Sequence, residues 1–321
     1  MSTSISNIST KFNTQAKCIA YLESLRWPDG KVISPFTGTT QVTKRSNSNF
    51  YHCNATNKDF SVLNGTIFDH SRFPLPKWFQ MIGLILNSKK GIAAKELERN
   101  VNCSYKTAWY VGMRVRCAMI DDCIELSNIV EMDEAYVGGK KRKVPSNHPS
   151  ISSVNTKRGR GTSKTPIVGV VERNGNVYLK VVQNLTASSL MKVLKDSVNV
   201  NNAIVMTDEF KSYKSFDKLV QHLTINHSQG YSKGIVHVNT IEGFWSIVKN
   251  SIKGNYVAIS KKYLPMYLVQ AQYIYNRRSA RHDLFQEFIK RALTEPKCLV
   301  NYKPTKAVEK IVYRPKKKAN C

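Results

Sequence analysis

The chain has 321 residues, enough for two or three compact units, and its 41% hydrophobic content is ordinary for a globular protein with a buried core. Lysine and arginine number 49 against 22 acidic residues, so the surface carries a positive field that attracts polyanions, nucleic acid first among them. This composition excludes a disordered chain. A membrane-surface role would need a concentrated amphipathic basic helix, which the sequence does not show.

The N-terminal stretch MSTSISNISTKFN lacks the basic-then-apolar layout of a secretion signal, and no run reaches the roughly 18 apolar residues of a membrane-spanning helix. We therefore expect an intracellular protein, placed in the cytoplasm or nucleoid of a prokaryote or in the nucleus of a eukaryotic or viral host. The seven cysteines show no paired short spacing, so we expect reduced thiols rather than a disulfide framework or a CxxC metal knuckle.

Residues 1–74 are expected to hold an N-terminal helix and a small β-rich unit. Short β-prone runs between residues 29 and 66 are separated by turn signals, the dipeptides Asp29-Gly30, Thr37-Gly38 and Asn64-Gly65. Such closely spaced turns favour short strands over long ones.

Residues 75–125 follow with a helical pattern that suggests a helix-turn-helix. Two short helices are predicted around a tight turn at residues 100–103, and Ser104 is placed to cap the second helix. In a helix-turn-helix this second helix enters the major groove, although many helical hairpins never touch DNA. The high positive charge favours the DNA-binding alternative. The side chains expected to face DNA are Tyr105, Lys106, Thr107 and Tyr110, while Ala108, Val111 and Val115 pack inward.

Residues 126–292 are predicted to form an α/β domain. The expected order of elements is strand, hairpin, helix, strand, strand and helix, with the hairpin turned at Asn174-Gly175. This order favours a mixed sheet covered by helices. Within it, the basic segment 140–164 is predicted to be a mobile loop, and residues 293–321 form a basic tail.

Three acidic residues are expected at the ends of elements in this domain. Asp133 ends the apolar run IVEMD, Asp208 ends AIVMTD, and Glu242 lies early in the predicted helix HVNTIEGFWSIVK. Carboxylates gathered at one sheet edge repel one another and raise their own pKa values unless divalent cations bind them. Oxygen ligands select magnesium or manganese over zinc, and two such ions serve in-line phosphoryl transfer.

Each of these acids also has an ordinary structural alternative: a strand-end cap for Asp133, a turn for Asp208 and a solvated helix position for Glu242. Glu131 and Glu134 compete with Asp133 for the same role. Because side chains alternate along a strand, Glu131 and Asp133 share one face and Glu134 takes the other.

The strings VEMDEAYVGGKK, VMTDEFKSY and HVNTIEGFWSIVKNSIKGNY resemble the catalytic domain of ISXO2-like insertion-sequence transposases, which are related to Merlin elements. The resemblance implies an RNase H-like fold, with helices on both faces of the sheet. It implies a DDE triad at Asp133, Asp208 and Glu242 that binds two Mg²⁺ or Mn²⁺ ions.

The same resemblance implies a lysine seven residues after the glutamate, which Lys249 matches. Nearly two helical turns separate the two residues, so Lys249 shares a face with Glu242 and can meet a DNA phosphate. Asn239 is expected to orient the acid or to touch DNA, with a helix cap as the alternative. The apolar residues of this helix are expected to anchor it on the sheet as core: Ile241, Phe244, Trp245 and Val248.

Two departures from the family pattern stand out. Relatives of this kind commonly carry a zinc ribbon with two CxxC pairs, where this chain has Ser34, Thr37, Cys53 and Thr56. Because hydroxyls do not replace thiolates in a structural zinc site, we expect a degenerate ribbon held by apolar contacts, without zinc. Gln270 and Ile274 stand where the pattern usually has Glu and Arg, and the lost charge pair would weaken helix docking or the binding of the element's ends.

The sequence therefore predicts a DNA transposase. By resemblance, the β unit and the helix-turn-helix recognise terminal inverted repeats in double-stranded DNA, and the catalytic domain cuts there and joins the ends to target DNA. Bringing two ends together implies a homodimer or a larger assembly. The alternatives are a domesticated DNA-binding protein with a vestigial site, and an RNase H-like nuclease that cleaves structured nucleic acid without terminal repeats.

Overall fold

The structure, a computed structural model, describes residues 4–121, 124–138, 164–225, 236–279 and 283–294. Residues 140–163 of the expected loop and 295–321 of the expected tail lie outside this range. The chain divides into two compact units. One consists of the described residues of Met1–Asp121 and Val269–Lys317, and the other of those of Asp122–Leu268. Among the described helices, none is long and apolar enough to cross a membrane.

The first unit contains the small β unit predicted from the turn signals. Strands β1 (Val42–Lys44), β2 (Tyr51–Cys53) and β3 (Lys58–Phe60) form an antiparallel sheet in that order. The glycines of all three predicted turn dipeptides have φ between 68° and 73°, a region where a side chain would strain the backbone. The rings of Tyr51 and Phe60 stack at 5.8 Å in its core.

Helices make up the rest of the first unit. Phe12, Phe79 and Phe285 meet in its core, with ring centroids 4.9 Å and 5.6 Å apart for the contacts of Phe79. The last described helix packs against three earlier ones, so this unit is built from two separate segments of the chain. Its helices are α1 (Ile5–Lys11), α2 (Gln15–Arg26), α3 (Leu75–Asn87), α4 (Ala94–Val101), α5 (Tyr105–Ala118) and α9 (Leu284–Thr294), and the boundary between the units falls within α8 (Leu264–Asn276).

The second unit contains a five-stranded mixed sheet in the order β6-β5-β4-β7-β8. The strand β4 pairs antiparallel with β5 and parallel with β7, while β5 pairs antiparallel with β6 and β7 pairs parallel with β8. The strands are β4 (Leu126–Val137), β5 (Thr165–Glu172), β6 (Val177–Val181), β7 (Val198–Asp208) and β8 (Gln221–Ile225), and the helical elements are α6 (Ala187–Ser197), η1 (Lys211–Lys218), α7 (Asn239–Ser251) and η3 (Ile252–Tyr256).

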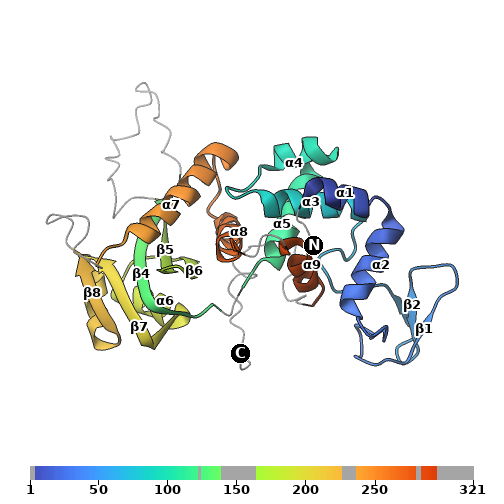
Figure 1. The fold of residues 1–321 in the computed structure, drawn as a ribbon, viewed down its shortest axis with the longest axis horizontal. Helices are drawn as coiled ribbons and strands as arrows, with labels where there is room; N and C mark the ends of the chain where they lie inside the picture. Colours follow the sequence, from blue (N-terminus) through green and yellow to red (C-terminus); the bar gives the residue numbers. More distant parts are fainter. Residues whose placement is uncertain (1–3, 122–123, 139–163, 226–235, 280–282, 295–321) are drawn as a thin grey trace, which may run out of the picture. The chain divides into compact units, whose positions relative to one another are not determined.

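Helices cover both faces of this sheet (Figure 1). Val130 and Met132 point to one face, where they share a core with residues of α6 and η1. Glu131 and Asp133 point to the other face and contact α7. The predicted mixed sheet with helices on both faces is therefore confirmed.

One prediction about the sheet is wrong. Asp133 does not end its strand, because β4 continues to Val137 with β5 as its antiparallel partner. The apolar run IVEMD appeared to end there because acidic residues close it, but β5 pairs with β4 from Val130 to Val137. Asp208 does end β7, as predicted.

Candidate active site

Two of the three predicted catalytic acids lie on neighbouring parallel strands. Glu131 of β4 is paired with Met206 of β7, so the same register continued by two residues puts Asp133 beside Asp208. The pKa of Asp133 is raised to about 7, first by burial and then by the carboxylate of Glu134, with Asp208 adding to the effect. A partly buried carboxyl group among anionic neighbours is an environment in which a bound cation is favourable.

The orientation of both aspartates is fixed by hydrogen bonds. The indole Nε1–H of Trp245 on α7 donates to Oδ2 of Asp133 at 3.0 Å. The backbone N–H of Phe210 donates to Oδ1 of Asp208 at 3.0 Å, where the chain turns away from β7. The prediction that Trp245 is a core residue is confirmed, since it is 3% exposed, but the sequence did not reveal this hydrogen bond.

Glu134 faces the opposite side of the sheet, as strand alternation predicts. The hydroxyl of Tyr213 on η1 donates to Oε2 of Glu134 at 2.9 Å. Burial and the nearby Glu134 carboxylate raise the pKa of Tyr213 well above its usual value. Glu134 is thus removed from direct competition with Asp133, although its charge still acts on that residue.

Glu131 has a role that the sequence analysis missed. Its carboxylate is fully buried and forms an ion pair with Arg173, with 2.6 Å between Oε1 and Nε. It also accepts hydrogen bonds from Oγ1 of Thr240 at 2.9 Å and from the backbone N–H of Ile241 at 3.0 Å. Both donors belong to the first turn of α7, whose own N-cap residue, Val238, provides no side-chain cap.

Glu131 is therefore a structural anchor for the start of α7. Arg173 strengthens the attachment, because its Nη2 also donates to the backbone oxygen of His237, just before the helix, at 2.9 Å. The sequence held a partial signal of this role, because a charged side chain such as Glu131 on the buried face of a strand requires a partner. The identity of that partner, 42 residues away in the β5–β6 turn, could not be read from local pattern.

Glu242 lies in the first turn of α7 and is exposed. It is located between the two points where this helix is attached to β4, Ile241 over Glu131 and Trp245 over Asp133. Among the described residues, however, no three His, Cys, Asp or Glu side chains form a group that could hold a metal ion. Asp133 and Asp208 lie on neighbouring strands, but the three predicted acids do not form such a group.

The aspartate pair nevertheless fits a magnesium ion. Mg²⁺ is usually held by one or two carboxylates, with water and substrate phosphates as the remaining ligands, so a closed protein cage is not required. The hard oxygen donors of Asp133 and Asp208 suit Mg²⁺ or Mn²⁺.

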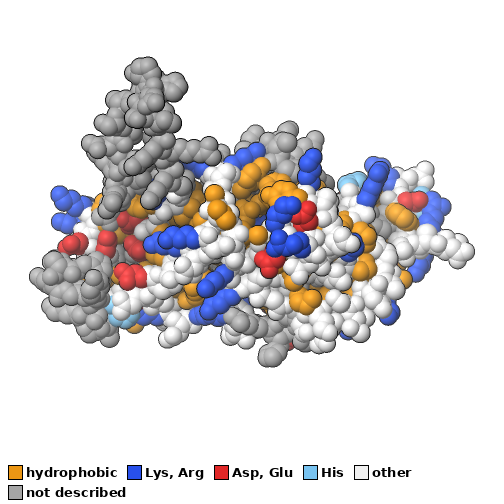
Figure 2. Space-filling model, turned by 90° about the horizontal axis from the view of Figure 1, so that it is seen from above, with side chains coloured by type: hydrophobic (Ala, Val, Ile, Leu, Met, Phe, Trp, Pro, Cys, Tyr) orange, Lys and Arg blue, Asp and Glu red, His pale blue; other side chains and the backbone are white. Residues whose placement is uncertain are grey.

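Two further predicted residues lie on α7. Lys249, in the last turn, is exposed and has no described contact that would keep it from a phosphate. Asn239 is exposed and is the first residue of the helix rather than its N-cap, so the helix-cap alternative is wrong. Figure 2 shows acidic side chains gathered on this unit, with lysine and arginine side chains also on its surface.

The predicted pair of short helices is present as α4 and α5. Asn102 ends α4 in the left-handed region, with φ of 51°, and Ser104 caps α5 by accepting from the N–H of Thr107 at 3.2 Å. Tyr105 and Lys106 are exposed at the start of α5. The residues predicted to pack inward are all buried: Ala108, Val111 and Val115.

Tyr110 is less available than predicted. It is partly buried, and its hydroxyl accepts a hydrogen bond from Nη1 of the buried Arg114 at 3.4 Å. Arg114 also donates to the backbone oxygen of Asp69 at 2.9 Å, which ties α5 to the chain that leaves the β unit.

Three of the four positions of the missing CxxC pairs carry hydroxyls, and these lie around the sulfur of the fourth, Cys53. Cys53 is buried, and Oγ1 of Thr37 lies 3.8 Å from its Sγ. The side chains of Ser34 and Thr56 are the main cause of a pKa lowered to about 6 for Cys53. One thiol and three hydroxyls do not fit a structural zinc site, so the prediction of a zinc-free unit stands on the chemistry of this donor set.

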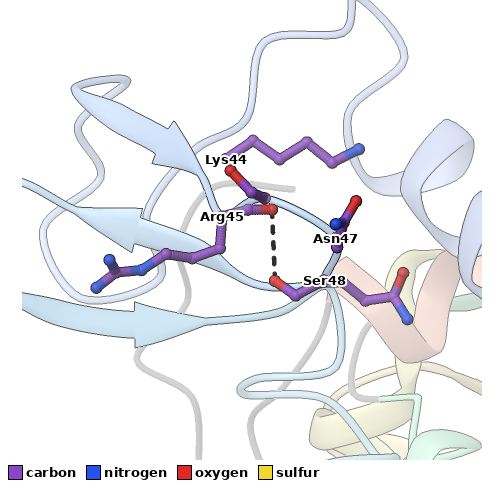
Figure 3. Close-up of a pocket in the computed structure, with 6 residues that line it drawn as sticks. Lys44, Arg45, Asn47 and Ser48 are labelled. Carbon is purple, nitrogen blue, oxygen red and sulfur yellow. Dashed lines mark hydrogen bonds between the residues drawn. The ribbon is translucent and has the colours of Figure 1, made fainter.

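The tip of the β1–β2 hairpin is a second polar feature of this unit. Its loop, residues 44–49, lines an open hollow (Figure 3). The side chains of Lys44 and Arg45 leave the hairpin in opposite directions. Arg45 pairs with Asp59 at 3.0 Å, whereas the Lys44 ammonium lies 5.8 Å from the ring centroid of Tyr51.

The departures at Gln270 and Ile274 have a structural explanation. Gln270 is buried and accepts a hydrogen bond from Nε of the buried Arg116 at 2.7 Å. Ile274 is 7% exposed and belongs to the core. The neutral amide therefore keeps a hydrogen bond at this position without the charge of a glutamate.

Comparison with known proteins shows a similarity to a transposase family over most of the second unit. Residues 125–276 match the model of the ISXO2-like transposase domain. The chain is 26% identical over 269 residues to an uncharacterized protein in transposable element ISH50 of Halobacterium salinarum, covering 80% of this chain and 89% of the relative. The resemblance to insertion-sequence transposases inferred from the sequence is confirmed.

Solved structures give a weaker likeness. A pre-cleavage Mos1 transpososome is 12% identical with a TM-score of 0.25, covering 66% of this chain and 77% of that chain. The mariner Mos1 paired end complex with Mg is also 12% identical, with a TM-score of 0.26, covering 70% of this chain and 81% of that chain.

Proposed function

We propose that the chain is a DNA transposase that cuts and joins DNA through a DDE triad, because residues 125–276 match the model of the ISXO2-like transposase domain. The observation that carries the proposal is the pair formed by Asp133 and Asp208 on adjacent strands of that domain. Asp133 is partly buried there among other carboxylates, as a site for a divalent cation requires. The strand order around β4 supports an RNase H-like fold.

In this proposal Asp133 and Asp208 hold Mg²⁺ or Mn²⁺, and Glu242 completes the ligand set when DNA is bound. Two ions, when bound, would activate the attacking oxygen and stabilise the leaving 3′ oxygen. The attachment of α7 to β4 on both sides of Glu242 supports this role, because it holds the helix over the strand that carries Asp133. The ordering of Glu242 into the site would then accompany substrate binding.

Other residues of α7 contact the DNA in this proposal. Lys249 binds a phosphate next to the reacting strand, because its exposed ammonium shares a helix face with Glu242. Asn239, exposed at the start of the helix, contacts DNA or orients Glu242. Both roles are peripheral to the chemistry, so their loss weakens binding more than it removes cleavage.

Recognition of terminal inverted repeats is assigned to the first unit, with α4 and α5 as a helix-turn-helix. Tyr105, Lys106 and Thr107 lie at the start of α5, where a recognition helix meets base edges. Tyr110 contributes less, because its hydroxyl contacts Arg114. The polar loop at residues 44–49 adds phosphate contacts, and two such chains bring two ends together as a homodimer or larger assembly.

The test is a strand-cleavage assay with Mg²⁺ on duplexes that carry the inverted repeats flanking the gene. The wild-type protein should nick at the repeat boundary and join the exposed 3′ end to a second duplex, and Asp133→Asn or Asp208→Asn should abolish both reactions. Glu209→Gln is the matched control, because Glu209 is an exposed carboxylate next to Asp208 and has no role in the proposal. It should cleave like the wild type.

Other outcomes favour the alternatives. Binding of repeat DNA without cleavage, unaffected by Asp208→Asn, would indicate a domesticated DNA-binding protein. Cleavage of branched or hybrid substrates without repeats would indicate a structure-selective nuclease. Either result would overturn the transposase proposal.

A further inference from the structure

The hydrogen bond between Trp245 and Asp133 links the core of α7 directly to the proposed metal site. Trp245 is 3% exposed, and its Nε1 lies 3.0 Å from Oδ2 of Asp133. A buried indole N–H usually finds a hydrogen-bond acceptor, and the acceptor that Trp245 meets is a carboxylate of the proposed site. The contact therefore does more than fill space.

The backbone beneath the indole is adapted to this position. Gly169 of β5 is the antiparallel partner of Asp133, and it lies under the ring of Trp245. A Cβ atom at residue 169 would stand 2.6 Å from Cζ2 of Trp245 and 2.9 Å from its Cη2. These distances are too short for non-bonded carbon atoms. Any residue other than glycine at position 169 would therefore displace the indole.

The indole is a donor only, and it carries no charge. It can therefore fix the rotation of the Asp133 carboxylate and leave its charge in place. A lysine or arginine at the same position would neutralise that charge. An ionised carboxylate has about four acceptor positions, so one N–H leaves room for a cation. Groups that orient metal ligands in this way commonly matter to metal affinity even though they never touch the metal.

We propose that Trp245 is a positioning residue, which orients Asp133 for a divalent cation, and that Gly169 provides the space for its indole. The inference rests on the proposed function in one respect, the assignment of Asp133 as a metal ligand. Its physical content is narrower than transposition, because it concerns metal binding by the protein without DNA.

The experiment measures Mn²⁺ affinity of the full chain by calorimetric titration in the absence of DNA. Trp245→Phe keeps an aromatic ring but removes the N–H donor, and it should weaken Mn²⁺ binding by about 10-fold or more. The matched control is Trp78→Phe in the first unit. Trp78 is also fully buried and donates its Nε1–H to a side-chain oxygen, Oγ of Ser71, at 3.0 Å.

The control separates positioning from loss of packing. Both variants lose a buried indole and should lose comparable thermal stability, but only Trp245→Phe should change the Mn²⁺ affinity. Equal affinities for the wild type and a folded Trp245→Phe variant would overturn the inference. An equal loss in both variants would do the same, since it would show a general effect of destabilisation.

Gly169→Ala provides a second variant that keeps the indole donor. The added methyl group should displace the ring and weaken Mn²⁺ binding in the same direction, and unchanged affinity in the folded variant would contradict the role given to Gly169. A wild-type protein that binds no Mn²⁺ at all, with or without repeat DNA, would count against the proposed function itself. The failure of the inference and that of the proposed function are therefore distinguishable.

Discussion

Two acids on the same face of β4, only two residues apart, have opposite environments. Glu131 is fully buried and is surrounded by donors: Arg173, Thr240 and the backbone N–H of Ile241. Asp133 accepts a hydrogen bond from the neutral indole of Trp245, and the carboxylates of Glu134 and Asp208 raise its pKa. The first carboxylate has the partners that a buried charge requires, and the second has neighbours of its own sign.

The difference teaches how to separate a structural acid from a candidate metal ligand. Position on the strand does not distinguish them, because alternation places both side chains under α7. Burial does not distinguish them in the expected direction either, since the more deeply buried acid is the structural one. The sign of the nearby charges does, because the ionised form of Asp133 has carboxylate neighbours that a bound cation would offset.

The largest expected effect is that of Glu131→Gln. The substitution removes the fully buried carboxylate charge that pairs with the partly buried Arg173, so we expect a loss of about 3–5 kcal/mol in the free energy of unfolding of the second unit. Chemical denaturation followed by circular dichroism measures it. Glu125→Gln, at an exposed position just before the same strand, should change stability by less than about 0.5 kcal/mol. A similar small change for Glu131→Gln would remove the contrast between the two acids.

Asp133→Asn should act in the opposite direction when no metal is present. The pKa of Asp133 is about 7 in the folded protein against 3.8 ordinarily. Between these values the folded state keeps Asp133 protonated while the unfolded state does not, so the wild type loses stability as the pH rises from about 4 to about 7. The loss is at most about 4 kcal/mol, at 1.36 kcal/mol per pH unit. The asparagine variant lacks this dependence and should be the more stable protein at pH 7.

Thermal unfolding in a chelator at several pH values measures the difference between these two proteins. The difference should grow as the pH rises through this window and then level off above the folded pKa. Curves that stay parallel across the window would show that the environment of Asp133 is not destabilising.

Manganese should stabilise the wild type and not the aspartate variants. At a free Mn²⁺ concentration 100 times the Kd, mass action adds about 2.7 kcal/mol to the stability of the second unit. Asp133→Asn and Asp208→Asn should show no such increase, whereas Glu209→Gln should keep it. Differential scanning fluorimetry with and without Mn²⁺ gives the comparison, and stabilisation that survives Asp133→Asn would place the metal elsewhere.

The smallest effect is expected on the opposite face of the sheet. Tyr213→Phe removes the hydroxyl that donates to Glu134 and should cost about 1–2 kcal/mol in stability. Mn²⁺ affinity should stay within about twofold of the wild type, because Glu134 does not share the face of Asp133. A large change in affinity would show that the two faces are coupled more strongly than their geometry indicates.

Much of this fold follows from local sequence pattern. The hairpin at Asn174-Gly175, the Ser104 cap and the glycine turns of the β unit are set by residues close together in the chain, so their physical cause is visible in the sequence. Alternation along β4 correctly separates Glu134 from Asp133 for the same reason.

The features that the sequence did not reveal depend on distant partners. The strand end at Asp133 was misplaced because β5 extends the pairing of β4. The anchoring role of Glu131 depends on Arg173 and Thr240, and the hydrogen bond of Trp245 depends on the helix crossing directly above Gly169. Such contacts are decided by tertiary packing, and neither periodicity nor spacing encodes them.

The donors around Glu131 also have a consequence for how copies of such a gene decay. A descendant that no longer moves but still has to fold loses any selection on Asp133, whose replacement by asparagine relieves repulsion. Glu131 remains under selection in the same descendant, because its loss removes the ion pair with Arg173 and the acceptor for the first turn of α7. Inactivated copies that are retained for DNA binding should therefore accumulate changes at the first position and not at the second.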